Sequence, residues 1–245
     1  MREKDAMKMI VKALMVDSAA GWKKQEEPSE YVSVNICGTL NILNAMVKNN
    51  IKKLIFASSS SVYGNNKSKK FREDDKNLNP LSPYAQTKKT CEDFINLYSR
   101  EYGINAVILR FFTVFGKKQR PDLAIKKFEK LIIENKPIPL YGDGSTVRDY
   151  TYIEDIVDGI ISAIDYDKTP FEIINLGSDN PIKLIYMIKS LEKELGKKAI
   201  IEYLPMQKGD ANRTCADITK AKKLLGYFPK HSFQEALHLS LNQQV

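Results

Sequence analysis

Residues 51–64 read Ile-Lys-Lys-Leu-Ile-Phe-Ala-Ser-Ser-Ser-Ser-Val-Tyr-Gly. The apolar start of this stretch, Ile51 to Ala57, predicts a short buried strand, and four serines follow it directly. In open α/β sheets, ligands bind beyond the carboxyl ends of the strands. The stretch therefore predicts a row of hydroxyl side chains at the binding edge of such a sheet.

A second motif follows in Ser82-Pro-Tyr-Ala-Gln-Thr-Lys88, where Tyr84 and Lys88 are four residues apart. On a helix this spacing places the phenol and the ammonium on one face. A free phenol has a pKa of about 10, and a neighbouring cation lowers it towards the working range of a base. The same spacing also occurs by chance, as a surface tyrosine stacked on a lysine stem. The serine run favours the chemical interpretation, in which a hydroxyl group loses its proton.

Strands and helices alternate along most of the chain. Apolar spacing predicts strands at 51–57, 105–110, 171–176 and 200–204, and helices at 29–49, 84–102, 123–135, 152–165 and 181–195, with two short helices at the end. This alternation is typical of parallel βαβ units, so we expect an α/β fold.

The composition is that of an ordinary globular protein, with 43% hydrophobic and 28% charged residues. No stretch approaches the about 18 apolar residues of a membrane span, and no signal peptide is visible. Cys37, Cys91 and Cys215 are scattered and odd in number, which is typical of reduced thiols in a cytoplasmic protein. His231 and His238 are the only histidines, so we expect no metal site.

The net charge of +8 raises the question of an acidic partner. The lysines lie on amphipathic helices such as 125–133 and form no tract with interleaved aromatic residues. Such lysines usually form solvated faces, so we expect no nucleic-acid partner.

Seven ordered blocks carry a resemblance to a known family. They are Asn35-x-x-Gly-Thr39, Ser58-Ser-Ser-Ser-Val-Tyr-Gly64, Ser82-Pro-Tyr-x-x-x-Lys88, Leu109-Arg-Phe-Phe-Thr-Val-Phe-Gly116, Tyr141-Gly-Asp-Gly144, Arg148-Asp-Tyr-Thr-Tyr-Ile-x-Asp155 and Ala216-Asp-Ile-Thr-Lys-Ala-Lys-Lys-Leu-Leu-Gly-Tyr227. From about Pro28 to Leu237 the chain resembles the extended short-chain dehydrogenase/reductase family, in particular its nucleotide-sugar epimerases and dehydratases.

The resemblance implies a Rossmann-like parallel sheet with a small interleaved α/β substrate-binding lobe. We expect residues 1–116 to be a partial NAD-binding domain with the catalytic motifs. Residues 117–245 would be the substrate-binding portion, with parts returning to the main sheet. The family opens with a Gly-x-x-Gly-x-x-Gly turn that cradles the dinucleotide pyrophosphate. No such turn occurs in these 245 residues, and the first glycine is Gly21. We therefore expect the first three strands of the sheet to be missing.

The resemblance also assigns roles in catalysis and cofactor binding. Tyr84 would take a proton from a sugar hydroxyl, and Lys88 would lower its pKa and bind the nicotinamide ribose of NAD. Ser59 would bridge the substrate oxygen and Tyr84. Asn35 would lie near the cofactor, although it could instead be a helix side chain whose hydrogen bonds are satisfied internally.

Two further residues would bind the nucleotide part of the substrate. Arg148 would clamp the pyrophosphate, because a guanidinium fork suits phosphate oxygens. Asp210 would hold the nucleoside ribose. The alternatives are a surface ion pair of Arg148 with Asp149 or Glu154, and a simple turn role for Asp210.

The substrate class follows from two segments. Residues 111–116 and 120–124 read Phe-Phe-Thr-Val-Phe-Gly and Arg-Pro-Asp-Leu-Ala, which is similar to the UDP-glucuronate 4-epimerases. The sugar carboxylate of a uronate could bind hydroxyl and cationic donors. The candidate substrate-binding residues are Ser60, Ser61, Thr113 and Arg120, and Gln207 also fits this subfamily.

The implied reaction is a transient oxidation at carbon 4 of UDP-glucuronate by bound NAD, which yields UDP-galacturonate. The alternatives are a UDP-glucose 4-epimerase, a sugar-nucleotide dehydratase, and a non-catalytic fragment or UDP-sugar-binding remnant. Without the glycine turn, we expect the chain alone to bind NAD weakly and to be inactive. Relatives commonly pair through helices corresponding to 29–49 and 84–102, which implies a homodimer.

Overall fold

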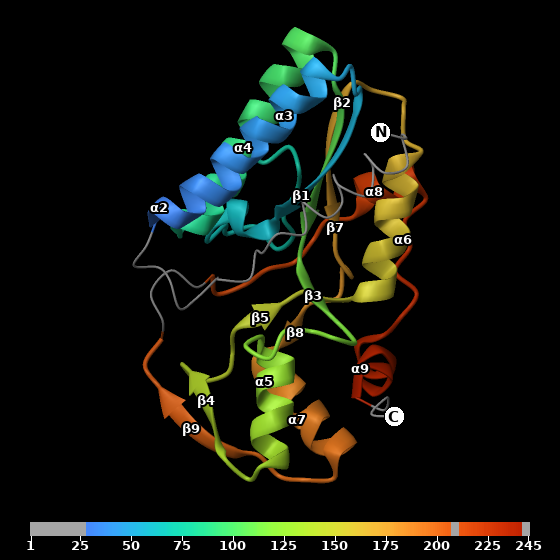
Figure 1. Cartoon of the computed structure of the whole chain (residues 1–245). Helices are drawn as coiled ribbons and strands as arrows, with labels where there is room; N and C mark the ends of the chain where they lie inside the picture. Colours follow the sequence, from blue (N-terminus) through green and yellow to red (C-terminus); the bar gives the residue numbers. More distant parts are fainter. Residues whose placement is uncertain (1–27, 207–210, 242–245) are drawn as a thin grey trace.

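The main sheet has three parallel strands in the order β1-β2-β7. The computed structural model describes residues 28–206 and 211–241. The strands of this sheet are β1 (Lys53–Ser59), β2 (Asn105–Phe111) and β7 (Phe171–Leu176) (Figure 1). The register pairs Ser59 with Phe111, so the carboxyl ends of β1 and β2 lie at the same edge. The predicted α/β fold with a Rossmann-like parallel sheet is confirmed.

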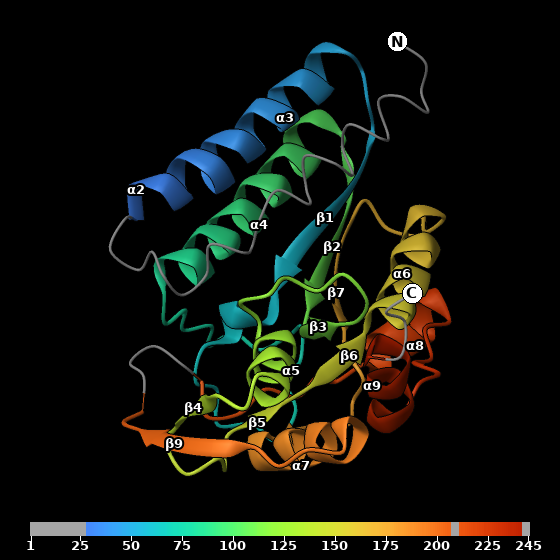
Figure 2. The ribbon, with the colours of Figure 1, turned by 60° about the horizontal axis from the view of Figure 1, so that its bottom comes forward.

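Helices cover both faces of this sheet. The helices α3 (Gly38–Lys48) and α4 (Pro83–Tyr102) lie on one face, and α6 (Ile153–Ile164) and α8 (Thr219–Leu225) lie on the other (Figures 1 and 2). Strand β2 is apolar towards both sides, as expected of a parallel strand buried on two faces. Its alternate side chains enter separate cores, with Ile108 facing α3 and α4 and Leu109 facing α6 and α8.

The helix predicted at 29–49 contains a π-helical segment. It consists of α2 (Pro28–Tyr31), the π segment η1 (Val32–Cys37) and then α3. π-helical segments are rare in proteins, and those that occur often lie at functional sites. Asn35 lies in this segment and is buried against α4, where its Nδ2 donates to the Thr87 hydroxyl at 2.9 Å.

The start and the end of α4 are both fixed by its sequence. Ser82 caps the helix, because its hydroxyl accepts from the backbone N–H of Ala85 at 3.2 Å, and Pro83 occupies the first turn. Gly103 ends the helix in the left-handed conformation, with φ of +64°. These signals place Tyr84 at the beginning of the helix, at the end that faces the second lobe (Figure 1).

The second lobe lies beyond the carboxyl ends of the main strands (Figure 2). Its elements, together with the short strands that link it to the sheet, are β3 (Thr113–Phe115), α5 (Ala124–Ile133), β4 (Pro137–Tyr141), β5 (Val147–Arg148), β6 (Tyr150–Tyr152), β8 (Ile182–Lys183), α7 (Leu184–Leu195), β9 (Ile200–Leu204) and α9 (Phe233–Leu241). Strands β3 and β6 pair in parallel, as do β4 and β9, whereas β5 and β8 are antiparallel. Strand β7 lies later in the chain than β3 to β6 but belongs to the main sheet.

Asp149, between β5 and β6, joins three segments through one fully buried carboxylate. It accepts from the backbone N–H of Ala216 at 2.9 Å, from the N–H and hydroxyl of Ser178 at 2.7 Å each, and from the Thr151 hydroxyl at 3.2 Å. Burial raises the pKa of this carboxyl group, and the hydrogen bonds oppose the rise. The carboxylate therefore connects the main sheet to the chain that enters the lobe.

Replacing Asp149 with Asn should destabilise the protein by about 3 kcal/mol, because an amide NH₂ would face backbone donors and the charge-assisted bonds would be lost. The free energy of unfolding in urea measures the effect. The control is Asp143→Asn, since Asp143 is exposed and accepts from the N–H of Ser145 at 2.9 Å, a bond that asparagine can also accept. Equal urea midpoints for the Asp149 variant and the parent would contradict the role of Asp149.

Candidate active site

The serine run forms a tight turn at the carboxyl end of β1. The strand continues through Ser59, and the chain then enters the 3-10 helix η2 (Ser60–Tyr63). The Ser59 Oγ accepts from the backbone N–H of Ser61 at 3.2 Å and from its hydroxyl at 2.9 Å. These bonds fix the Ser59 oxygen at the edge of the sheet, and Ser60 and Ser61 lie beside it.

Gly64 brings the chain back towards the serines. It has φ of +61°, and a Cβ there would lie 1.7 Å from the carbonyl oxygen of Asn79, so only glycine fits. The two residues form a β-bridge at the base of the loop between η2 and α4. Because of this bridge, the loop ends close to the carboxyl end of β1, and Ser82 and Tyr84 follow there.

Tyr84 and Lys88 lie on the face of α4 that packs on the sheet. Lys88 is 7% exposed, and its Nζ donates to the carbonyl oxygen of Ala57 at 3.0 Å. The same Nζ lies 5.8 Å from the centre of the Tyr84 ring and 5.1 Å from that of Phe56. The Tyr84 ring is half-buried and makes an edge contact with Tyr31 at 6.0 Å. The structure therefore places the ammonium beside the phenol, as the spacing predicts.

Burial lowers the pKa of Lys88, and the nearby Cys91 and Glu92 side chains raise it in part. An ammonium in such a place attracts a neighbouring anion more strongly than one in water. The structure therefore holds a buried cationic group close to the Tyr84 ring.

Asn35 is linked to Tyr84 by hydrogen bonds through Thr87. Its amide donates to the Thr87 hydroxyl, which in turn donates to the backbone carbonyl of Tyr84 at 2.9 Å. The backbone carbonyl of Asn35 accepts from the Cys91 thiol at 3.2 Å. The side chain is thus hydrogen-bonded within the helix pair, and its contact with Tyr84 passes through Thr87.

The remaining candidates come from both parts of the molecule. Thr113 begins β3, just beyond the end of β2, and its N–H donates to the carbonyl of Asp149 at 2.9 Å. Arg120, before α5, pairs with Asp122 at 3.0 Å. Arg148, in β5, donates from Nη1 to the carbonyl of Val147 at 2.9 Å. Gln207 and Asp210 lie outside the described residues.

One buried polar cluster was not predicted from the sequence. Glu92 and Arg110 are each 2% exposed and form a two-pronged ion pair, with Nε–Oε1 at 3.0 Å and Nη2–Oε2 at 2.7 Å. Burial alone would lower the pKa of Arg110, but its bonds with Glu92 and Tyr63 hold the pKa above the ordinary value. The available signals were a glutamate one turn after Lys88 and an arginine inside an apolar strand.

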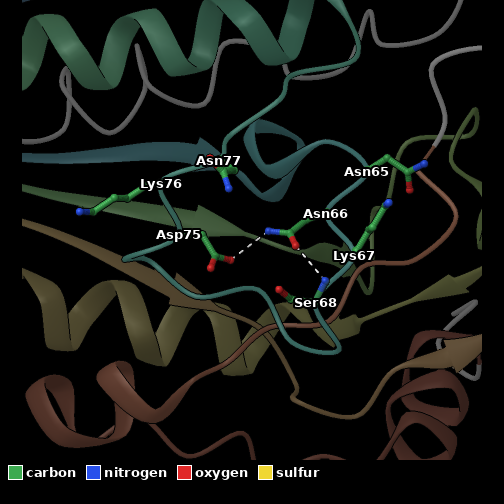
Figure 3. Close-up of a pocket in the computed structure, with 7 residues that line it drawn as sticks. All are labelled: Asn65, Asn66, Lys67, Ser68, Asp75, Lys76 and Asn77. Atoms are coloured by element: carbon green, nitrogen blue, oxygen red, sulfur yellow. Dashed lines mark hydrogen bonds between the residues drawn. The ribbon is translucent and has the colours of Figure 1, made fainter.

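A polar pocket lies in the loop between η2 and α4 (Figure 3). Its lining residues are Asn65, Asn66, Lys67, Ser68, Asp75, Lys76 and Asn77. Asn66 donates to Asp75 at 3.0 Å and accepts from the N–H of Ser68 at 2.8 Å. All of these residues come from one loop, and none of them is a predicted site residue.

Within residues 28–206 and 211–241, no group of three or more His, Cys, Asp or Glu side chains could hold a metal ion. In the same ranges, no helix is long and apolar enough to cross a membrane.

A parallel sheet with Ser59 at the end of a strand, and Tyr84 and Lys88 on the next helix, defines a short-chain dehydrogenase/reductase type of protein. The chain belongs to the NAD dependent epimerase/dehydratase family, whose model matches residues 4–177.

Its curated relatives include a UDP-glucuronate 4-epimerase of Thermodesulfobacterium geofontis, 47% identical over 218 residues. An uncharacterized protein of Methanocaldococcus jannaschii is 48% identical over 212 residues. The alignments cover 89% and 86% of this chain but 67% and 65% of the relatives. The chain thus spans about two thirds of their length.

Among solved structures, the chain is similar to the UDP-glucuronic acid 4-epimerase of Bacillus cereus in complex with UDP-glucuronic acid and NAD. The TM-score is 0.82 at 39% identity, with 89% of this chain and 69% of that chain covered. A UDP-glucose 4-epimerase of Thermotoga maritima with UDP-glucose gives a TM-score of 0.83 at 31% identity, covering 88% and 70%.

Proposed function

We propose that this chain carries the catalytic and sugar-binding part of a nucleotide-sugar 4-epimerase that converts UDP-glucuronate to UDP-galacturonate. The observation that carries the proposal is the placement of Tyr84 beside the buried Lys88 ammonium, at the edge of the sheet where Ser59 is fixed. The names of the Thermodesulfobacterium and Bacillus relatives support the uronate.

Tyr84, Ser59 and Lys88 would act together on the 4-hydroxyl group of the sugar. Tyr84, as phenolate, accepts the proton of the sugar 4-hydroxyl, and Ser59 donates a hydrogen bond to the oxygen that becomes a carbonyl. Lys88 keeps the phenol acidic by its charge. After the keto sugar turns over, Tyr84 returns the proton to the same oxygen. When bound, NAD, the cofactor of this family, would supply the hydride chemistry at carbon 4.

The described residues fit the nicotinamide end of this cofactor. An ammonium has three donors, and the hydrogen bond of Lys88 to the carbonyl oxygen of Ala57 uses one of them. The other two donors would bind hydroxyls of the nicotinamide ribose. For the adenosine end, the 245 residues contain no Gly-x-x-Gly-x-x-Gly turn.

The substrate would extend from the serines to the second lobe. Hydroxyls of Ser60, Ser61 and Thr113 and the guanidinium of Arg120 would bind the sugar carboxylate, because charge-assisted hydrogen bonds are strong. Arg148 would bind the pyrophosphate. Asp210, with Gln207 nearby in the sequence, would bind the nucleoside.

The direct test is an assay of UDP-glucuronate and UDP-glucose with added NAD. Two forms are compared: the 245-residue chain alone, and a fusion in which residues 28–245 follow the corresponding amino-terminal segment of the Thermodesulfobacterium relative. We expect the fusion to convert UDP-glucuronate at least about 100-fold faster than UDP-glucose, the size of effect that two charge-assisted bonds supply. Conversion of UDP-glucose alone would assign the protein to the alternative neutral-sugar epimerases.

A further inference from the structure

We propose that Glu92 is a positioning residue, which holds the helix of Tyr84 and Lys88 in register with the strand that carries Ser59. This inference rests on the proposed function for its meaning in catalysis, but its structural content can be tested separately. Glu92 itself lies one turn further along α4 than Lys88, away from the reacting groups.

The helix is tied to β1 at two successive residues. The Lys88 Nζ donates to the backbone carbonyl of Ala57 at 3.0 Å, and the Ser58 hydroxyl donates to Glu92 Oε1 at 2.5 Å. Ser59 follows directly in the strand. Successive turns of the helix therefore bind successive residues of the strand, and this fixes where Tyr84 and Lys88 stand relative to the Ser59 hydroxyl.

Glu92 is in turn clamped by the middle strand. Arg110 binds both of its carboxylate oxygens, and the register places Arg110 between Ser58 of β1 and Asn175 of β7. The guanidinium also lies 4.8 Å from the centre of the Tyr63 ring, whose hydroxyl donates to Asn175 at 2.8 Å. Ser58 of β1 and Arg110 of β2 thus hold the carboxylate, and the Tyr63 ring lies against the guanidinium.

Stability alone does not explain this ion pair. Taking two charges out of water is costly, and well-packed apolar residues often replace a buried pair without loss of stability. Apolar contacts are not directional, whereas the bonds of Glu92 with Ser58 and Arg110 are made in one helix register only. Such precision matters at a reactive site, where a shift of about 1 Å can reduce the rate about 100-fold.

The test uses the full chain labelled with 3-fluorotyrosine and ¹⁹F nuclear magnetic resonance, which needs no turnover. The Tyr84 resonance is assigned by its loss in Tyr84→Phe. Ser58→Ala removes only the bond between helix and strand, and the double variant Glu92→Met/Arg110→Met removes the ion pair while keeping the volume. In both we expect the Tyr84 resonance to shift by more than its linewidth.

The matched control is Ser99→Ala. Ser99 is also a buried serine, on α4 itself, and its hydroxyl donates to the carbonyl of Pro170 at 3.1 Å, far from Tyr84 along the helix. Its loss should leave the Tyr84 resonance in place. If Ser58→Ala and the double variant are folded and the resonance does not move, the positioning role is wrong and the epimerase proposal stands. If Tyr84→Phe keeps full turnover in the fusion, the epimerase mechanism fails, while the fluorine signal still decides the role of Glu92.

Discussion

Replacing Tyr84 with Phe should reduce the conversion of UDP-glucuronate by the fusion protein at least about 1,000-fold. Phenylalanine keeps the ring and its edge contact with Tyr31 at 6.0 Å but removes the hydroxyl that we propose takes the proton. A positioned base contributes about 100- to 10,000-fold, and here the same group must also return the proton. The measurement is kcat for UDP-glucuronate, with calorimetric binding of UDP unchanged.

The matched control for this variant is Tyr98→Phe. Tyr98 is on the same helix, and its hydroxyl donates to Asn44 at 2.7 Å in the contact with α3. Its loss should change kcat by less than about threefold, as expected for a surface hydrogen bond. A Tyr84→Phe protein with more than a tenth of the parent rate would assign the proton transfer to another group.

Replacing Lys88 with Met should lower kcat at pH 7 about 100-fold and change the pH dependence of the rate. Methionine fills the same buried space without the ammonium that lies 5.8 Å from the Tyr84 ring. The phenol should then return towards its ordinary pKa of about 10, so the fraction of phenolate at pH 7 falls steeply. Turnover of the variant should rise about tenfold per pH unit up to about pH 10, whereas the parent should change much less.

The direction in which the pH profile of Lys88→Met shifts tests whether the ammonium acts on the acidity of Tyr84. A cation favours the charged phenolate, so its removal raises the pKa of the phenol and moves the active form to higher pH. The control is Lys89→Met, because Lys89 pairs on the outer side of the helix with Asp93 at 2.5 Å. A pH profile of Lys88→Met that parallels the parent at a lower rate would show that Lys88 acts without changing the acidity of Tyr84.

The sequence was sufficient for the parts of the site that depend on local signals. The strand before the serines and the helix over 84–102 are marked by local apolar spacing, so Tyr84 and Lys88 could be placed on one helix face. The strand begins and ends two residues later than predicted, at Lys53 and Ser59. That difference arises because pairing with β2, rather than local preference, determines where the strand ends.

Features set by contacts between distant segments could not be predicted. The partners Glu92 and Arg110 are 18 residues apart, and their pairing needs the packed helix and sheet. The strands β3, β5, β6 and β8 have two or three residues each, too few for a periodic pattern. The sequence around Asn35 predicts an ordinary α-helix, and its apolar spacing does not indicate the π segment η1. The domain division, the roles of all the candidate site residues, the homodimer and the weak NAD binding stay predictions.

The β-bridge between Gly64 and Asn79 determines where the length of the chain can differ among related proteins. Because Gly64 and Asn79 pair at the base of the loop, the two ends of the segment between them lie close together. Phe71, within this loop, is anchored because its N–H donates to the carbonyl of Cys215 at 2.8 Å. Residues can be added or removed between Gly64 and Phe71 without moving Ser59 or Tyr84. Differences in length there should therefore carry no information about the chemistry, whereas any residue larger than glycine at position 64 would push the two halves of the site apart.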